Sequence, residues 1–190
     1  MGPAWRERVR RPLGRAWSAG LRARVAVPLW LLALTLAVAA ASKAQTSYPL
    51  IGQAAPDFAL RAAAGSNVRL SEHRGEVVVL SFWSSRCAQC RTQLAALHRS
   101  LATYQSAGLA IYGVGVDDDP VQALGFARSE AVGFALLLDP AKAVSRSYQI
   151  DNLPMTVLID RNGTVRHVLR DYSAASNGLY LRELRALLNE

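Results

Sequence analysis

The chain has 190 residues, of which 51% are hydrophobic, and a formal net charge of +8. Residues 1–44 hold eight of the 22 basic residues and one of the 14 acidic residues, which leaves 14 basic and 13 acidic residues after them. The basic surplus therefore belongs to the N-terminal segment. The nearly neutral remainder excludes a nucleic-acid-binding domain as the source of the high charge.

The N-terminal segment has the pattern of a membrane-targeting sequence. Residues 1–24 form a basic leader with seven arginines, and residues 25–41 carry no charged side chain. We predict a single-pass anchor at 25–41 in the inner (cytoplasmic) membrane, although this length also suits the core of a signal peptide cleaved near Ala44. Because the arginines keep the N-terminus in the cytoplasm, both alternatives send the rest to the periplasm or another extracytoplasmic space.

Residues 42–50 are predicted to be a linker, and residues 51–190 have the size of one domain. The expected elements are a hairpin around 64–67, a strand at 77–83, a helix at 87–105, a strand at 109–116, a helix at 120–131, a strand at 134–138, a helix at 141–148, a hairpin of strands 155–159 and 165–169, and a helix at 179–188. Asp119 is expected to cap the helix at 120–131, and Asn162-Gly163 to supply positive φ angles in the second hairpin. This order predicts an α/β fold with a central mixed sheet covered on both faces.

The only two cysteines form the sequence Cys87-Ala88-Gln89-Cys90, directly after the predicted strand at 77–83. If Cys87 caps the following helix, the two residues share one helix face with Cα atoms about 5 to 6 Å apart, which suits a disulfide. The pair can therefore open and close without backbone movement. This arrangement predicts a redox site.

A structural disulfide and a zinc site are the alternatives for the same pair. Closing a four-residue loop contributes only about 2 kcal/mol in the chain-entropy model, so the pair does little as a staple. A closed zinc site needs four ligands, and the single histidines His73, His98 and His167 are scattered along the chain. We therefore predict no metal at the pair.

Four sequence blocks in this order resemble the thioredoxin superfamily, and within it the membrane-tethered TlpA-like (ResA-type) thiol-disulfide oxidoreductases. The blocks are 52–58, 79–83 leading into the cysteine pair, 108–116 and 153–160, and the resemblance covers residues 48–190. It implies a thioredoxin fold with an N-terminal hairpin extension, no bound cofactor, and disulfide exchange with protein partners.

The resemblance also assigns residues to this activity. It implies that Pro154 is cis and faces the cysteines, with the backbone of Leu153 and Pro154 open to an incoming peptide. Trp83 is expected to contribute to partner binding. The chain departs from the family at Arg86, where tryptophan is usual, and at Gln93, where glutamate is frequent.

The two cysteines are expected to differ in role. Cys87 is the predicted nucleophile, because the N-terminus of a helix stabilises a thiolate, and Arg86 and Arg91 add positive charge near it. Cys90 lies one turn deeper and is the predicted resolving thiol. Since Gln93 cannot accept a proton, we expect exchange to depend more on cations than on a carboxylate relay.

The direction of electron flow follows from the resemblance alone, which favours a reductant for cytochrome c maturation or for copper-site cysteines, re-reduced by a membrane electron donor. A peroxiredoxin-like peroxidase is one alternative, but residues 83–86 lack the proline and threonine that shape a peroxide pocket. A copper carrier is another, and it would require a third ligand such as His167 to face the pair.

Overall fold

The computed structural model of the chain describes residues 48–190. The predicted leader, the predicted anchor at 25–41 and most of the linker lie outside these residues. Between positions 48 and 190, no helix has the length and apolar character needed to cross a membrane. Tyr48 and Leu50 fall in the predicted linker but pack against the core, so the folded part begins before Ile51.

The centre of the domain is a mixed sheet, as predicted, and the structure shows that it has seven strands. Its strands, in chain order, are β1 (Ala59–Ala62), β2 (Asn67–Arg69), β3 (Val77–Trp83), β4 (Leu109–Gly115), β5 (Ala135–Leu138), β6 (Met155–Ile159) and β7 (Val165–Leu169). Their order across the sheet is β2-β1-β5-β4-β3-β6-β7. Strands β3, β4 and β5 run parallel, and all other neighbours are antiparallel. The carboxyl ends of β3 and β4 therefore meet at one edge of the sheet.

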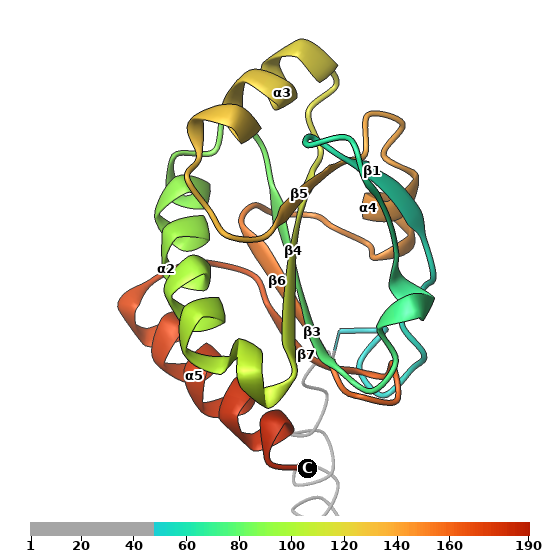
Figure 1. Cartoon of the computed structure of the whole chain (residues 1–190), viewed down its shortest axis with the longest axis vertical. Coiled ribbons are helices and arrows are strands. Elements are labelled where there is room, and N and C mark those ends of the chain that lie inside the picture. The colour runs from blue at the N-terminus through green and yellow to red at the C-terminus, as the bar shows by residue number, and fades with distance from the viewer. Residues whose placement is uncertain (1–47) are drawn as a thin grey trace, which may run out of the picture. The chain divides into compact units, whose positions relative to one another are not determined.

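Helices cover both faces of this sheet. They are α2 (Ala88–Tyr104), α3 (Pro120–Ser129), α4 (Ala143–Ser147) and α5 (Ala174–Leu188), with 3-10 turns η2 (Leu70–His73) and η3 (Gln105–Ala107). Figure 1 shows α2 and α5 side by side on one face, with α4 on the other. The two faces confirm the layered α/β arrangement expected from the order of elements.

Strand β3 contributes side chains to the core on both faces of the sheet. All seven of its residues are buried, because neighbouring strands and helices enclose both faces, as expected for a central parallel strand. Val77 and Val79 pack in the cluster formed with α2 and α5. Val78 and Leu80 pack in the cluster that includes α4. Ser81 and Trp83 lie on the same side of the strand as Val77 and Val79. They therefore face α2, at whose N-terminal end the cysteines lie.

Two local predictions need correction. Helix α5 begins at Ala174, five residues before the predicted start, because Ser173 and Ser176 form a reciprocal capping box. In the second hairpin, only Gly163 has a positive φ, at 81°. The Asp160 side chain instead accepts hydrogen bonds from the backbone N–H groups of Asn162 and Thr164, at 3.0 and 2.9 Å.

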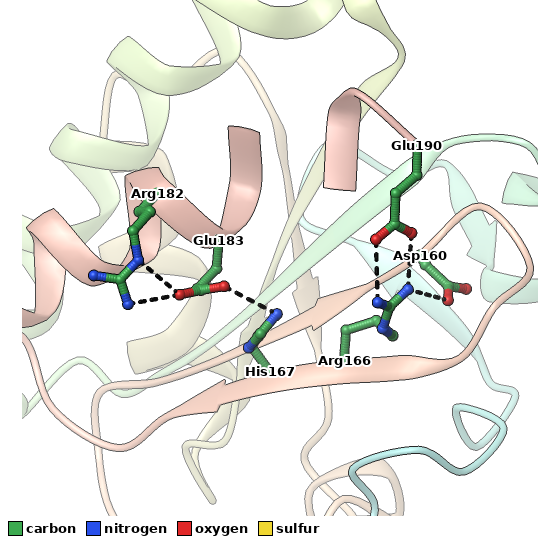
Figure 2. A network of polar contacts seen from close by, with 6 residues as sticks. All are labelled: Asp160, Arg166, His167, Arg182, Glu183 and Glu190. Atoms are coloured by element: carbon green, nitrogen blue, oxygen red, sulfur yellow. Dashed lines mark hydrogen bonds and ion pairs between the residues drawn. The ribbon is translucent and has the colours of Figure 1, made fainter. Parts of the chain in front are cut away.

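Two groups of charged side chains join β7 to the C-terminal part of the chain, one of them at helix α5 and one at Glu190, after the helix (Figure 2). Arg166 contacts Glu190 at 2.8 Å and Asp160 at 3.2 Å. The Nε2 atom of His167 lies 3.4 Å from Glu183, on α5. Such partly exposed pairs each contribute about 0 to 1 kcal/mol, so the apolar contacts between α5 and the sheet stabilise the docking more than these pairs do.

Candidate active site at the cysteine pair

Cys87 and Cys90 form a disulfide with Cα atoms 5.3 Å apart, within the predicted range. Cys87 is the N-cap of α2, and its Sγ atom accepts a 3.2 Å hydrogen bond from the backbone N–H of Cys90. Cys87 is half-buried, whereas Cys90 has no exposed surface. The sulfur of Cys87 is therefore the one that a partner can reach, and it lies where backbone donors favour an anion.

Trp83 packs beneath the pair and does not reach the surface. Its side chain is fully buried, in a cluster with Cys90, and its ring stacks on Phe126 with centroids 4.8 Å apart. The indole lies across β4 at Gly115, where an added Cβ would approach it to 2.6 Å. The predicted role of Trp83 in partner binding is therefore wrong, because a fully buried indole supports the site from below and offers no contact surface.

Gln93 forms a buried bridge between two strands of the sheet. Ser81 on β3 and Thr156 on β6 are paired across the antiparallel ladder. The Ser81 hydroxyl donates to Gln93 Oε1 at 2.8 Å, and Gln93 Nε2 donates to Thr156 Oγ1 at 2.7 Å. Gln93 thus lies one turn after Cys90 on α2 with both ends of its amide satisfied. The bridge is neutral at every pH that the fold tolerates.

The two arginines predicted to tune the thiolate have different surroundings. Arg86 is exposed beside Cys87, and its charge contributes to a lowered pKa of Asp118, after the larger effect of Lys142. Arg91 lies 3.1 Å from Glu130, and its guanidinium stands 5.2 Å from the centre of the Phe126 ring. A carboxylate partner offsets the charge of Arg91, so Arg86 is the stronger candidate for an effect on Cys87.

The Leu153–Pro154 peptide bond is cis, as the resemblance implied. Pro154 is buried, and Leu153 is partly buried against the cluster that contains both cysteines. Strand β6 begins at the next residue, Met155. The structure therefore brings the loop at 153–154 together with the cysteine pair, although Leu153 follows Cys90 by 63 positions in the sequence.

Sequence reasoning missed Asp117, which is the second residue after the end of β4. Its carboxylate binds Ser84 and Ser85, the two residues that follow β3. A signal was present in the sequence, because parallel strands end at a common edge and place the residues that follow them side by side. Asp117 and the cysteine pair both follow such strands.

His167 lies away from this arrangement, since its ring contacts Glu183 on α5 (Figure 2). In residues 48–190, no group of three or more His, Cys, Asp or Glu side chains is placed to hold a metal ion. The copper-carrier alternative therefore gains no support from the described part of the chain.

Comparisons with known proteins identify a family and several relatives that are named for thiol-disulfide chemistry. The model of the AhpC/TSA family matches residues 51–168. The thiol-disulfide oxidoreductase ResA of Geobacillus kaustophilus is 32% identical over 119 residues, which are 63% of this chain and 68% of that protein. ResA of Bacillus subtilis is 30% identical over 118 residues, which are 62% and 66%. A putative thiol:disulfide interchange protein DsbE from Chlorobium tepidum superimposes with a TM-score of 0.69 at 32% identity, covering 73% of this chain and 97% of that one.

Proposed function

The chain belongs to the AhpC/TSA family and is a ResA-like thiol-disulfide oxidoreductase with a thioredoxin fold, and from this we propose that it reduces disulfides of partner proteins outside the cytoplasm. The observation that carries the proposal is the arrangement of the two sulfurs. Cys87 is reachable at the N-cap of α2, and Cys90 is buried behind it. This arrangement separates an attacking thiol from a resolving thiol.

In the proposed reaction the chain starts as the dithiol. The Cys87 thiolate attacks one sulfur of the partner's disulfide, a mixed disulfide forms, and the other partner sulfur leaves as a thiolate that takes up a proton. Cys90 then loses its proton and attacks the Sγ atom of Cys87. The second partner sulfur leaves, and the Cys87–Cys90 disulfide seen in the structure remains. Two electrons have passed from the chain to the partner.

The loop at Leu153–Pro154 suits partner binding through backbone hydrogen bonds. Proline has no backbone N–H, so the first ladder donor of β6 comes after Pro154. We propose that an extended segment of the partner pairs with the backbone of Leu153, which packs in the same cluster as Cys87. Such pairing reads the backbone of the partner and not its side chains. It suits an enzyme whose substrates share a disulfide and differ in sequence.

The location and the partners of the chain are inferred from the N-terminal sequence and the resemblance. We propose that residues 25–41 anchor it in the cytoplasmic membrane, with 51–190 in the periplasm or extracytoplasmic space. The proposed clients are cysteine pairs of apocytochromes or copper-site proteins. Because such compartments are oxidising, the pair must be re-reduced by a dedicated membrane electron donor.

The test is to trap the client in cells that express the full-length chain. Cys90→Ser should accumulate a mixed disulfide on Cys87 that disappears on treatment with a thiol, and mass spectrometry then identifies the client. Cys87→Ser is the matched control and should trap nothing. Adducts that form equally with both variants would contradict the assigned roles of the cysteines.

A second measurement separates this function from its alternatives. The purified dithiol chain should reduce a disulfide-containing client and should consume hydrogen peroxide no faster than a free thiol does. Turnover of peroxide at an enzymatic rate would favour the peroxidase alternative. Copper that copurifies with the chain and is lost in Cys87→Ser would favour the carrier.

A further inference from the structure

The buried carboxylate of Asp117 holds the turn that precedes the reactive cysteine. Asp117 is 5% exposed. Its Oδ1 atom accepts hydrogen bonds from the hydroxyls of Ser84 at 2.6 Å and Ser85 at 3.0 Å, and its Oδ2 atom accepts one from the Ser85 backbone N–H at 2.8 Å. Hydrogen bonds to an ionised acceptor are stronger than neutral ones, so this clasp is a strong local constraint.

The clasp continues toward the reactive sulfur through the backbone. The Ser84 hydroxyl oxygen accepts from the Arg86 N–H at 3.3 Å, and the Ser84 carbonyl accepts from the Cys87 N–H at 3.1 Å. Cys87 in turn caps α2. A continuous set of hydrogen bonds thus connects the end of β4 to the residue that begins the helix. Asp117 touches neither cysteine, so any effect it has on them passes through this turn or through its charge.

We propose that Asp117 is a positioning residue of the exchange reaction, which keeps Cys87 at the N-cap of α2 when the disulfide is open. In the disulfide state, the covalent bond to Cys90 already restrains Cys87. Reduction removes that bond, and the turn at 84–86 then depends on the clasp and on the backbone hydrogen bond from the Cys87 N–H to the Ser84 carbonyl. The clasp therefore stabilises the dithiol state more than the disulfide state. This inference rests on the exchange activity of the pair.

The proposed positioning and the charge of Asp117 have opposite effects on the Cys87 thiolate. A negative charge near a thiol disfavours its ionised form, so loss of that charge alone would lower the pKa of Cys87. Loss of the clasp would instead move Cys87 away from the backbone donors at the N-terminus of α2 and raise its pKa. The direction of the shift therefore tells which effect dominates.

The experiment compares Ser84→Ala, Asp117→Ala and Asp119→Asn in the full-length chain. Ser84→Ala removes the hydroxyl that joins Asp117 to the Arg86 N–H, which is the part of the clasp directed toward Cys87, and leaves the carboxylate and its bonds from Ser85 in place. Asp119→Asn removes a charge two residues away and keeps a side chain that can cap α3, as Asp119 does. The readouts are the pKa of Cys87, followed by ultraviolet thiolate absorbance, and the equilibrium of the pair with glutathione.

Ser84→Ala and Asp117→Ala should both raise the pKa of Cys87 and favour the disulfide about tenfold, a shift of about 30 mV to a more negative potential for this two-electron couple. Asp119→Asn should neither raise the pKa of Cys87 nor favour the disulfide.

If folded Ser84→Ala leaves both readouts at wild-type values, or if the pKa of Cys87 falls, the positioning role is wrong. The proposed exchange activity of the pair is not affected by that outcome. A wild-type chain without a reversible couple would overturn both. Because Ser84 is partly exposed, its variant tests the proposal even if Asp117→Ala fails to fold.

Discussion

The Gln93 side-chain nitrogen donates a 2.7 Å hydrogen bond to the hydroxyl oxygen of Thr156, two residues after the cis proline. The other end of the same amide accepts from Ser81. Two strands and the cysteine-bearing helix are thus joined by a side chain that carries no charge. At position 93, where the family often has a glutamate, this chain has a fixed neutral bridge. The proton of Cys90 must therefore reach another acceptor.

We expect Gln93→Glu to make the stability of the fold depend on pH. Burial raises the pKa of a carboxyl group above its ordinary value of about 4.3. When the pKa of a carboxyl group is higher in the folded chain than in the unfolded chain, the free energy of unfolding is highest below the unfolded-state pKa. It falls as the pH rises through the folded-state pKa. The free energy of unfolding should therefore be near that of wild type at about pH 4 and lower by about 1 to 3 kcal/mol at neutral pH.

Urea unfolding at both pH values measures this effect, with the exposed Gln105→Glu as control. The same variant should also speed the resolving step at neutral pH, because it places a base one turn after Cys90. Equal pH dependence in Gln93→Glu and Gln105→Glu would contradict the buried bridge.

We expect Gly115→Ala to destabilise the chain through Trp83. An added Cβ at Gly115 would lie 2.6 Å from the indole, which is rigid and enclosed on all sides. Overpacking of this kind costs about 1 to 3 kcal/mol. Gly125→Ala is the matched control, since an added Cβ there meets nothing within 4 Å and lies inside α3.

Alanine at position 125 should stabilise the helix by about 0.5 to 1 kcal/mol. Chemical denaturation of both variants measures the difference between them. Loss of stability in both alike would show that the close approach of Trp83 to Gly115 is unimportant.

The two arginines near the pair should respond differently to removal. Arg86→Ala should raise the pKa of Cys87 by a few tenths of a unit, about the size of one exposed charge interaction, and the effect should vanish at 1 M salt. Arg91→Ala should leave that pKa nearly unchanged and lower the free energy of unfolding by about 1 kcal/mol, because Glu130 and the Phe126 ring lose their cation. Thiolate absorbance titrations at low and high salt check the first effect, and urea unfolding checks the second. A larger pKa shift in Arg91→Ala than in Arg86→Ala would reverse the assignment.

We expect the fold to lose stability at alkaline pH because several tyrosines are buried. Burial, with a smaller effect of the Glu76 charge, raises the pKa of Tyr112 from 10 to about 12. Burial also raises the pKa of Tyr148 and Tyr180. A raised tyrosine pKa gives stability that is present below pH 10 and is lost as the pH rises toward the folded-state value.

A tyrosinate absorbance titration should therefore show that some of the six tyrosines ionise only above the ordinary range, and Tyr112→Phe should remove one of these late steps. Ionisation of all of them together near pH 10 in the folded chain would contradict the burial.

Features that depend on neighbouring residues were predictable without the fold. The periodicity of apolar residues located β6 and β7 with the bounds that the structure shows, and the i, i+3 spacing of Cys87 and Cys90 already implied a distance compatible with a disulfide. No local sequence pattern specifies a cis bond before Pro154. Its cis state was predictable only from the resemblance to the family. The early start of α5 was missed, since a serine takes the position where a capping box usually has an acid or amide.

Which distant residues meet around the pair depends on how the strands and helices pack together. Asp117 reaches Ser84 across 33 positions, and Gln93 reaches Thr156 across 63. These contacts depend on which strands become neighbours and on which face each side chain occupies. The burial of Trp83 has the same origin, because the indole needs a strand partner without a Cβ, and the pairing of Trp83 with Gly115 supplies it. Local sequence limits the conformation of each segment, but the packing of one segment on another selects the atoms that surround the reactive sulfur.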